Sequence, residues 1–525
     1  MQRNSWSTFL FPPIKWLLIS CTVGYLFVAT ANVGTPATVN PLHVLIVGGG
    51  PDKENNQVAI ESNVRYVGRL LPPGTVHTTL FADGNPRHAT VLYDEDMRAL
   101  APARQLLTLL LSGREGAADA SHYRPPNLGL SLDGAARLAP INNAFTQLAH
   151  DTASNSFPVL LYFTGHGSPD DADKENNKFD LWDGEHKGEA LSVRQLAQQV
   201  ARLPANVPVT LVMVQCFAGS FGNLLFEGGD PQGQPIKRDL AGFFATVKDH
   251  MAAGCTSAVN EAEYHDFTSY FFAALTGRDR MGRAITGADY NHDGRVGMDE
   301  AYCYTLSHDV TIDIPVCTSD VFLRRWVKGA DTKIFQIPYS DVQAWATPAQ
   351  RAALEALSRQ LHLSGDGRLD EAYRNLSDMP SSVAMDKLRR GAIYQRNLHT
   401  IQHFDALRLK GRRALLRQWP ALRTPGTKSY TSVENKALAA LTRQIKAGRW
   451  QDLLSTAGSL DKAVESMESQ EAAESYLVRF VRLCKSVVLA HNLQEHGDPA
   501  LQARFNHLVE LEGQTLLSPA TSTPR

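Results

Sequence analysis

Two residues that can act together in catalysis, His166 and Cys216, lie 50 positions apart in the chain. Each follows a short apolar run rich in β-branched and aromatic residues, 158–165 before the histidine and 208–215 before the cysteine. A thiol beside an imidazole can pass its proton to the ring and attack a carbonyl carbon. Because ligands bind at the carboxyl ends of the strands in an open α/β sheet, this placement predicts that both side chains face one cleft.

Glycine residues follow both members of the pair. Gly167 comes directly after the histidine, where a missing side chain lets a substrate approach the backbone and an N–H group can stabilise an oxyanion. Gly219 lies just beyond the cysteine. The alternative is a buried, inert cysteine and an unrelated loop histidine. The shared context of the two residues favours nucleophilic catalysis over that alternative.

The elements that must position this pair alternate between apolar strands and amphipathic helices. Strands are expected at 43–47, 76–81, 158–165, 179–182 and 208–215, helices at 58–71, 99–112, 137–150, 191–203 and 268–276, and a helix followed by a further strand within 239–259. This alternation predicts an α/β fold over residues 42–345, with a mostly parallel sheet that helices cover on both faces.

The rest of the chain carries helical periodicity and no strand pattern. Helices are expected at 347–363, 369–376, 382–398, 401–418, 432–446, 448–455, 460–491 and 499–516. Residues 346–517 are therefore expected to form an all-α domain. The Ser/Thr/Pro-rich tail 518–525 predicts disorder.

The N-terminal residues have the features of an export signal. An uncharged, largely apolar stretch, Trp16–Ala29, follows Arg3 and Lys15 and ends in small residues. This pattern is typical of a secretory signal peptide over residues 1–31, followed by a linker at 32–41. An uncleaved N-terminal anchor is the alternative. The protein is expected to be exported, periplasmic or secreted, and to contact a membrane only through this segment if the segment is not cleaved.

Removal of the signal peptide would leave five of the six cysteines. An odd number of cysteines in an exported protein leaves at least one free thiol, for which Cys216 is the natural candidate. Cys303 and Cys317 are close enough in sequence to form a disulfide, although spacing alone does not establish one. Within the signal segment, Leu18–Cys21 also resembles the lipobox of a bacterial lipoprotein signal, although Lys15 leaves only a short apolar stretch before Cys21.

The size and charge of the chain restrict its function. Its 525 residues are too many for one core, so more than one domain is expected. A net charge of −2 gives no long-range attraction to nucleic acid or to an anionic membrane. Gly48–Gly50 follows a strand but lacks the third glycine of a dinucleotide site, so no organic cofactor is expected. A peptide or protein substrate is the expected partner, and nucleic acid is not.

Three segments resemble the legumain-like cysteine peptidases of the caspase-fold clan: Tyr162–Ser168, Leu191–Leu196 and Val214–Ser220. The resemblance covers roughly residues 42–275. It implies a caspase-like fold, a catalytic dyad of His166 and Cys216, and an oxyanion hole made by the N–H groups of Gly167 and Cys216. Cysteine-type endopeptidase activity through a thioester intermediate follows from this resemblance.

The chain departs from the legumain pattern at three places. Gly165 stands where legumains have aspartate, and Phe217–Gly219 replaces Glu-Ser-Gly. In legumains, an arginine in the loop after the first strand binds the asparagine or aspartate side chain of the substrate. The matching stretch 53–58 of this chain has no arginine. The acidic loop 260–266 would instead favour a basic residue at P1, unless it is only a solvated loop. The candidate substrate contacts are Asn55, Gln57, Gln215, Ser257, Asn260 and Glu263.

The segment Asp289–Glu300 matches the loop of an EF-hand. The side chains of Asp289, Asn291, Asp293 and Glu300 and the carbonyl of Arg295 would bind a structural Ca²⁺, with Gly294 at the turn. An Asp/Gly turn that binds no ion is the alternative. The segment His362–Tyr373 matches the EF-hand loop less well, because it has histidine at loop position 1 and tyrosine at position 12. It predicts a turn that binds no ion.

Two other classes of function stay open. One is a catalytically inactive, calcium-binding interaction protein of caspase-like fold, which would present its helical domain to a partner. The other is a transpeptidase of the same fold, in which an amine rather than water takes the thioester.

Overall fold

The computed structural model describes residues 42–94, 100–112, 121–184, 188–329, 331–377, 382–424 and 427–516. The predicted signal segment 1–31, the linker 32–41 and the tail 518–525 lie outside these residues, so what the sequence indicates there stays a prediction. In the described part, no helix combines the length and the apolar character that crossing a membrane requires.

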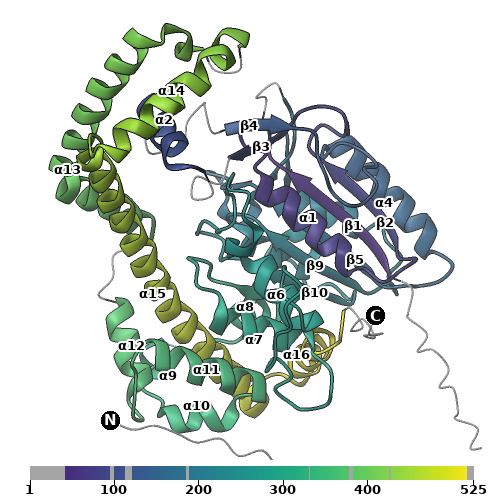
Figure 1. The fold of residues 1–525 in the computed structure, drawn as a ribbon. Helices are drawn as coiled ribbons and strands as arrows, with labels where there is room; N and C mark the ends of the chain where they lie inside the picture. Colours follow the sequence, from purple (N-terminus) through teal and green to yellow (C-terminus); the bar gives the residue numbers. More distant parts are fainter. Residues whose placement is uncertain are drawn as a thin grey trace, which may run out of the picture. The chain divides into compact units, whose positions relative to one another are not determined.

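A six-stranded sheet forms the centre of the α/β region (Figure 1). Its strands, in spatial order, are β11 (Val316–Cys317), β10 (Leu240–Phe244), β9 (Val209–Val214), β5 (Val159–Gly165), β1 (His43–Gly49) and β2 (Val76–Phe81). All neighbours pair in parallel except β10 and β11. Both β1 and β5 are buried at every position, as expected of strands that are covered on both faces. The predicted α/β fold is confirmed.

Two small antiparallel sheets lie beside the large one. The first pairs β3 (Val91–Asp94) with β4 (Ser121–Arg124). The second joins β6 (Gly167–Ser168), β7 (Lys178–Asp180) and β8 (Ala190–Ser192). Because β6 begins at the residue after His166, this second sheet fixes the path of the chain as it leaves the histidine.

Five helices of the α/β region, α1 to α6, lie close to their predicted positions, whereas α7 and α8 were not among the expected helices. The helices of this region are α1 (Val58–Leu70), α2 (Pro102–Ser112), α4 (Leu138–Thr152), α5 (Val193–Val200), α6 (Phe267–Thr276), α7 (Met298–His308) and α8 (Thr318–Trp326). Short 3-10 helices are η1 (Lys174–Asn176), η2 (Ala218–Leu225), η3 (Glu227–Gly229) and η4 (Glu261–Glu263). The start of α5 is set by Ser192, whose hydroxyl accepts a hydrogen bond from the N–H of Gln195 in a capping box.

The helix expected within 239–258 is wrong, because Leu240–Phe244 forms strand β10. A short apolar run does not distinguish a buried strand from a buried helix by periodicity. Tertiary contacts decide here. The strand is buried at every position, and the N–H of Gly242 donates to the hydroxyl of Thr318 at 3.0 Å.

The C-terminal region is helical, as expected. Its elements are α9 (Asp331–Ile334), α10 (Tyr339–Trp345), α11 (Pro348–Gln360), α12 (Arg368–Ser377), α13 (Ser382–Gln418), η5 (Pro420–Arg423), α14 (Lys428–Lys446), α15 (Gln451–His496) and α16 (Pro499–Glu512). Two pairs of expected helices are continuous, as α13 with 37 residues and α15 with 46 residues. Neither predicted break contains a proline, and Gly458 inside α15 costs only about 1 kcal/mol in a helix.

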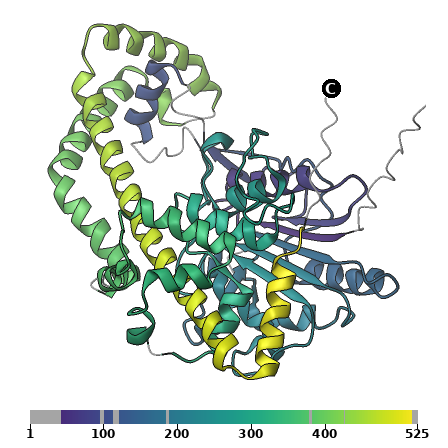
Figure 2. The same ribbon diagram turned by 90° about the horizontal axis from the view of Figure 1, so that it is seen from below.

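The helical region buries its apolar side chains in two cores. The larger core holds the sheet together with α7, α10, α11, α16 and the C-terminal half of α15, so the predicted boundary at residue 345 falls inside it. The second core joins α2, α13, α14 and the N-terminal half of α15. Figures 1 and 2 show α15 running from the region of α13 and α14 to α16. At Gly411 of α13, a side chain would meet Leu110 and Trp450 within 2.7 Å, so glycine permits this packing.

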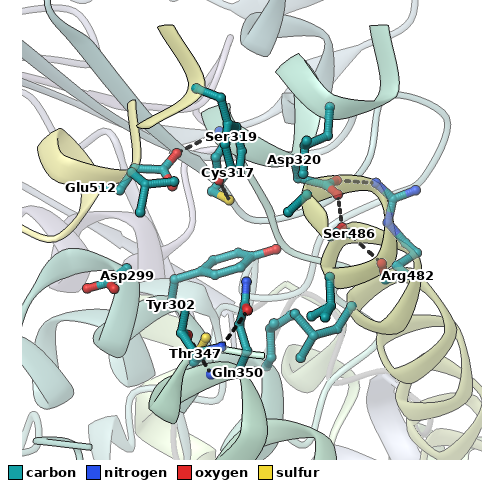
Figure 3. Close-up of a pocket in the computed structure, with 18 of the residues that line it drawn as sticks. Asp299, Tyr302, Cys317, Ser319, Asp320, Thr347, Gln350, Arg482, Ser486 and Glu512 are labelled. Atoms are coloured by element: carbon teal, nitrogen blue, oxygen red, sulfur yellow. Dashed lines mark hydrogen bonds and ion pairs between the residues drawn. The ribbon is translucent and has the colours of Figure 1, made fainter. Parts of the chain in front are cut away.

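A cavity of about 340 Å³ lies where α7, β11, α8, α11, α15 and α16 meet (Figure 3). Glu512, near the end of α16, is 3% exposed at the edge of this cavity. Its carboxylate accepts hydrogen bonds from the Thr318 hydroxyl and the Ser319 N–H, each at 2.7 Å, which dock α16 on the start of α8. Burial raises the pKa of Glu512 to about 7.

Replacing Glu512 with glutamine is expected to flatten the pH dependence of stability. The native state holds a proton on Glu512 that the unfolded chain releases near pH 4.5, the ordinary value for this group. This stabilisation is full below about pH 4.5 and is lost as the pH rises through 7, a change on the order of 3 kcal/mol. Glutamine keeps the acceptor oxygen and cannot ionise.

Thermal unfolding of the parent and of Glu512→Gln between pH 5 and 8 measures this difference. Glu510→Gln, an exposed carboxylate on the same helix, is the control and should keep the parent's slope. Parallel curves for the parent and Glu512→Gln would contradict the prediction.

Candidate active site

His166 and Cys216 leave the sheet at the same edge. Strands β5 and β9 are parallel neighbours whose last paired residues are Thr164 and Val214, and each candidate lies two positions beyond. The backbones that follow also meet, because a side chain at Gly167 would lie 2.3 Å from the carbonyl oxygen of Cys216. The structure thus brings the predicted pair to one site, and only glycine fits at position 167.

The imidazole of His166 is held through Nε2. This atom lies 3.0 Å from the carbonyl oxygen of Asn55 and 2.9 Å from Oε1 of Gln57. A carbonyl oxygen only accepts, so Nε2 carries the proton and Nδ1 keeps its lone pair. Asn55 is fixed in turn by Asp52, which accepts from its backbone N–H at 2.9 Å and from its amide at 2.8 Å. Burial lowers the pKa of His166, so the ring is neutral near pH 7.

The thiol of Cys216 is half-buried and has a backbone donor. The N–H of Ala252 lies 3.3 Å from Sγ. Burial raises the pKa of Cys216, with the hydrogen bond from residue 252 opposing that rise. A thiol that is neutral near pH 7 therefore stands at the site, and the Ala252 N–H is placed to stabilise the thiolate once it forms.

A strained turn follows Cys216. Phe217 has φ +61°, a left-handed conformation that few residues other than glycine adopt, and its N–H donates to the carbonyl of His250 at 2.9 Å. At Gly219, a side chain would lie 2.8 Å from the backbone of Thr246 and Lys248. The turn packs closely against the segment 246–250. These contacts hold the strained backbone, and with it the Cys216 thiol, in one position.

The N–H of Gly167 points away from its neighbouring strand. The N–H of Asp180 donates to the carbonyl of His166 at 3.0 Å, so these two residues form a hydrogen-bonded pair of the β6–β7 ladder. Such pairs alternate with non-bonded ones in antiparallel sheets. Gly167, opposite Phe179, falls on a non-bonded position, which leaves its N–H free of the ladder.

Six residues were expected to contact substrate, and two of them serve the histidine instead. Asn55 and Gln57 bind the His166 ring, as described above. Gln215 is 1% exposed, and its amide oxygen and nitrogen have no hydrogen-bond partner in the described part of the chain.

The other three predicted contacts make local interactions. Ser257 donates to the carboxylate of Asp94. Asn260 caps η4 and donates to Glu263 at 2.9 Å. Within the same acidic loop, Glu261 pairs with arginines of α1, so part of its negative charge is neutralised. These contacts supply no observation in favour of a pocket for a basic side chain.

Sequence reasoning missed three groups around the pair. Asp180 accepts from Ser168 at 2.6 Å, and its charge opposes the lowering of the His166 pKa. Cys255 is an exposed residue whose thiol lies 3.8 Å from the carbonyl oxygen of Gly165. Asp313 is fully buried, accepts from the N–H of Ala253 at 2.7 Å, and has a pKa that burial raises well above its ordinary value. None of the three stands in a motif that sequence alone would single out.

Arg479 of α15, in the helical region, binds the segment 309–313, which in turn contacts the residues that hold the Cys216 thiol. It is 1% exposed and donates to the carbonyl oxygens of Asp309 and, at 2.7 Å, Asp313. An ion pair of 3.6 Å also joins it to the Asp309 carboxylate. The side chain of Asp313 binds the N–H of Ala253, and residue 252 binds the thiol. A continuous chain of contacts therefore connects α15 with Cys216.

All five described cysteines, which include Cys303 and Cys317, are free thiols. Cys303 lies in α7 and Cys317 in β11, and both are buried. Their closeness in sequence does not make them a disulfide in this structure.

The loop Asp289–Glu300 has the backbone of an ion-binding turn. Gly294 has φ +85°, and its N–H donates to Asp289 at 3.0 Å. Glu300, at the start of α7, turns both carboxylate oxygens onto N–H groups of the loop. Oδ1 of Asp289 is buried without a hydrogen-bond partner in the described residues. The carboxylate oxygens of Asp289 and Glu300 are ligands of the type that calcium prefers.

The carboxylates of this loop do not converge on one point in this structure. Within the residues that the structure describes, no three His, Cys, Asp or Glu side chains converge as metal ligands. The loop carboxylates bind backbone N–H groups instead, so calcium binding would require these groups to exchange partners.

Comparisons with known proteins do not identify a family or a function for this chain. No family model and no curated protein matches the chain. A solved structure, protein GSU0716 from Geobacter sulfurreducens, is similar with a TM-score of 0.29 and 12% identity over 53% of this chain and 92% of the other. A likeness at that level carries no argument about fold or activity.

Proposed function

We propose that this chain is a cysteine endopeptidase of the legumain-like, caspase-fold type, with Cys216 as nucleophile and His166 as base. The observation that carries the proposal is the common exit of the two side chains from neighbouring parallel strands, with the imidazole held through Nε2. Nδ1 is left as the proton acceptor. The proposal includes export through the segment 1–31 and a peptide or protein as substrate.

The reaction begins from two neutral groups. Nδ1 of His166 takes the thiol proton as Sγ of Cys216 attacks the peptide carbonyl carbon. The N–H groups of Gly167 and Cys216 stabilise the negative oxygen of the tetrahedral intermediate. The protonated imidazole then gives its proton to the leaving amine. A water molecule, deprotonated by the same ring, attacks the thioester carbonyl. The acid product is released as the C–S bond breaks, and the ring returns its proton to the Cys216 sulfur.

A peptide library digested with the full chain tests the proposal. New amino and carboxyl termini, identified by mass spectrometry, are expected in the parent and would reveal the P1 preference. Addition of an amine nucleophile distinguishes the transpeptidase, which would join the amine to the acyl fragment. An unchanged library at high enzyme concentration, with no labelling by an acyloxymethyl ketone, would favour the inactive interaction protein.

The pH dependence of alkylation is expected to reveal the neutral dyad. Burial raises the pKa of Cys216 and lowers that of His166. Iodoacetamide should therefore react slowly at pH 7 and faster as the pH rises beyond about 9. Because the base must be neutral, kcat/KM should stay high down to about pH 6.5 and fall only below it.

These measurements are best made in Cys255→Ala, which removes the second thiol of the site. A pre-formed thiolate–imidazolium pair would contradict the prediction. It would give an alkylation rate that is already high and nearly constant between about pH 5 and 8.

We also propose that the loop Asp289–Glu300 binds Ca²⁺ and braces the start of α7. Calcium at 100 times its dissociation constant would stabilise the fold by about 2.7 kcal/mol, which should raise the melting temperature by a few degrees. Glu300→Gln should abolish this shift. Asp366→Asn, in the loop expected to bind no ion, should keep it. The same melting temperature with calcium and with EGTA would contradict the proposal.

A further inference from the structure

The C-terminal half of α13 and the short helix η5 form a hollow with a cationic lining. Its volume is about 770 Å³, and its lining residues are Lys410, Arg412, Arg413, Leu416, Arg417 and Arg423. No carboxylate is part of this lining. The surrounding segment 382–428 holds eleven lysine and arginine residues against two aspartates, although the whole chain has a net charge of −2.

The cations of the hollow lack the partners that other arginines of this protein have. Elsewhere in the described residues, arginines such as Arg65, Arg280 and Arg324 form ion pairs with carboxylates. No carboxylate in the described parts of the chain forms an ion pair with the five basic side chains of the hollow. Among the described residues, the one hydrogen-bond acceptor of Arg413 is a carbonyl of its own helix, at 3.2 Å.

The arrangement is costly without an anion. Lys410 and Arg413 are three positions apart and Arg413 and Arg417 four, so they face one another on one side of the helix. Like charges at these spacings destabilise a helix by a few tenths of a kcal/mol per pair. A ligand with several negative charges would turn this repulsion into attraction.

The backbone beneath the hollow is fixed by packing. Leu415 and Leu416 are buried in the second core, and Gly411 lies against Leu110 and Trp450. Leu422 of η5 is 1% exposed in the same core. The cations therefore extend from an ordered support and not from a free tail, which lowers the entropy lost on binding.

We propose that this hollow binds the oligophosphate group of a ligand. Guanidinium groups form paired, charge-assisted hydrogen bonds with phosphate oxygens, and four of the five cations are arginines. The volume fits a small ligand and not a folded protein partner. No aromatic side chain is part of the lining, so the hollow lacks the stacking surface with which single-stranded nucleic acids are bound.

Titration calorimetry of the full chain with sodium tripolyphosphate tests the inference, with citrate at equal ionic strength as a second anion. Tripolyphosphate is expected to bind at least about tenfold more tightly than citrate. The double variant Arg413→Gln/Arg417→Gln should weaken it by about tenfold or more. Arg443→Gln/Lys446→Gln removes the same charge from α14 outside the hollow and should change binding by less than about twofold. Melting temperatures without ligand verify that both variants are folded.

Vesicles distinguish the source of the phosphate group. Co-sedimentation with phosphatidic acid vesicles that Arg413→Gln/Arg417→Gln abolishes would indicate a lipid headgroup. Binding of tripolyphosphate without co-sedimentation would indicate a soluble ligand. The inference is overturned if tripolyphosphate binds no better than citrate, or if both double variants weaken it equally. None of these readouts depends on peptidase activity.

Discussion

Cys216→Ala should lower the rate of peptide hydrolysis by on the order of 10⁴-fold or more, with the melting temperature close to that of the parent. The alanine side chain cannot form the thioester, and the remaining oxyanion donors leave only a small residual rate. Half-burial of the thiol keeps the loss of packing small. The measurement is hydrolysis of the best peptide from the library, together with labelling by an acyloxymethyl ketone.

Cys255→Ala is the matched control for this prediction. Cys255 is an exposed residue whose thiol lies 3.8 Å from the carbonyl oxygen of Gly165, the last residue of β5, next to the same site. Its removal should leave both hydrolysis and labelling near the parent level. Labelling that persists in Cys216→Ala and disappears in Cys255→Ala would show that the nucleophile has been assigned to the wrong cysteine.

Arg479→Met is expected to reduce both stability and catalysis, although the residue lies on α15, outside the sheet. Removal of one member of a buried ion pair costs about 3–5 kcal/mol because the other charge stays buried. Here Asp309 would lose its cation, and the carbonyl of Asp313 would lose its donor. The segment 252–253, which rests on Asp313, would then hold the thiol less firmly.

The rate of alkylation at Cys216 as a function of pH separates positioning from general destabilisation. Arg479→Met should shift this profile at temperatures well below unfolding, and Arg479→Lys should restore part of the stability. Arg482→Met, which removes an ion pair to Asp320 one turn further along α15, should lower the melting temperature without moving the profile. Identical profiles for Arg479→Met and Arg482→Met would refute a positioning role.

The part of the site that lies on regular strands could be predicted from the sequence. His166 and Cys216 follow apolar runs long enough to be read as buried strands, and the parallel arrangement then places them together. The bonds of the imidazole were not predictable in this way. Asn55 and Gln57 were expected to bind substrate, whereas the β1–α1 loop turns them onto Nε2.

Contacts between distant segments carry no local signature. Ala252 donates to a sulfur 36 positions away, and Arg479 binds a carbonyl 166 positions away. Periodicity likewise gave no means of telling β10 from a helix, since every one of its side chains is buried. The helical character of the C-terminal region was predictable from the sequence, but the lengths of its helices were not. Helices α13 and α15 continue through stretches where the apolar pattern is weak and a break was expected.

The helix α15 has the dimensions of a lever arm. Its 46 residues extend about 69 Å at 1.5 Å per residue. One end is clamped in the second core and the other in the core of the sheet. A tilt of roughly 5° about one clamp would carry the far tip through about 6 Å. Arg479 lies in the stretch of α15 whose apolar neighbours are buried in the core of the sheet, so one continuous helix joins the α13–α14 region to the residue that supports the Cys216 site.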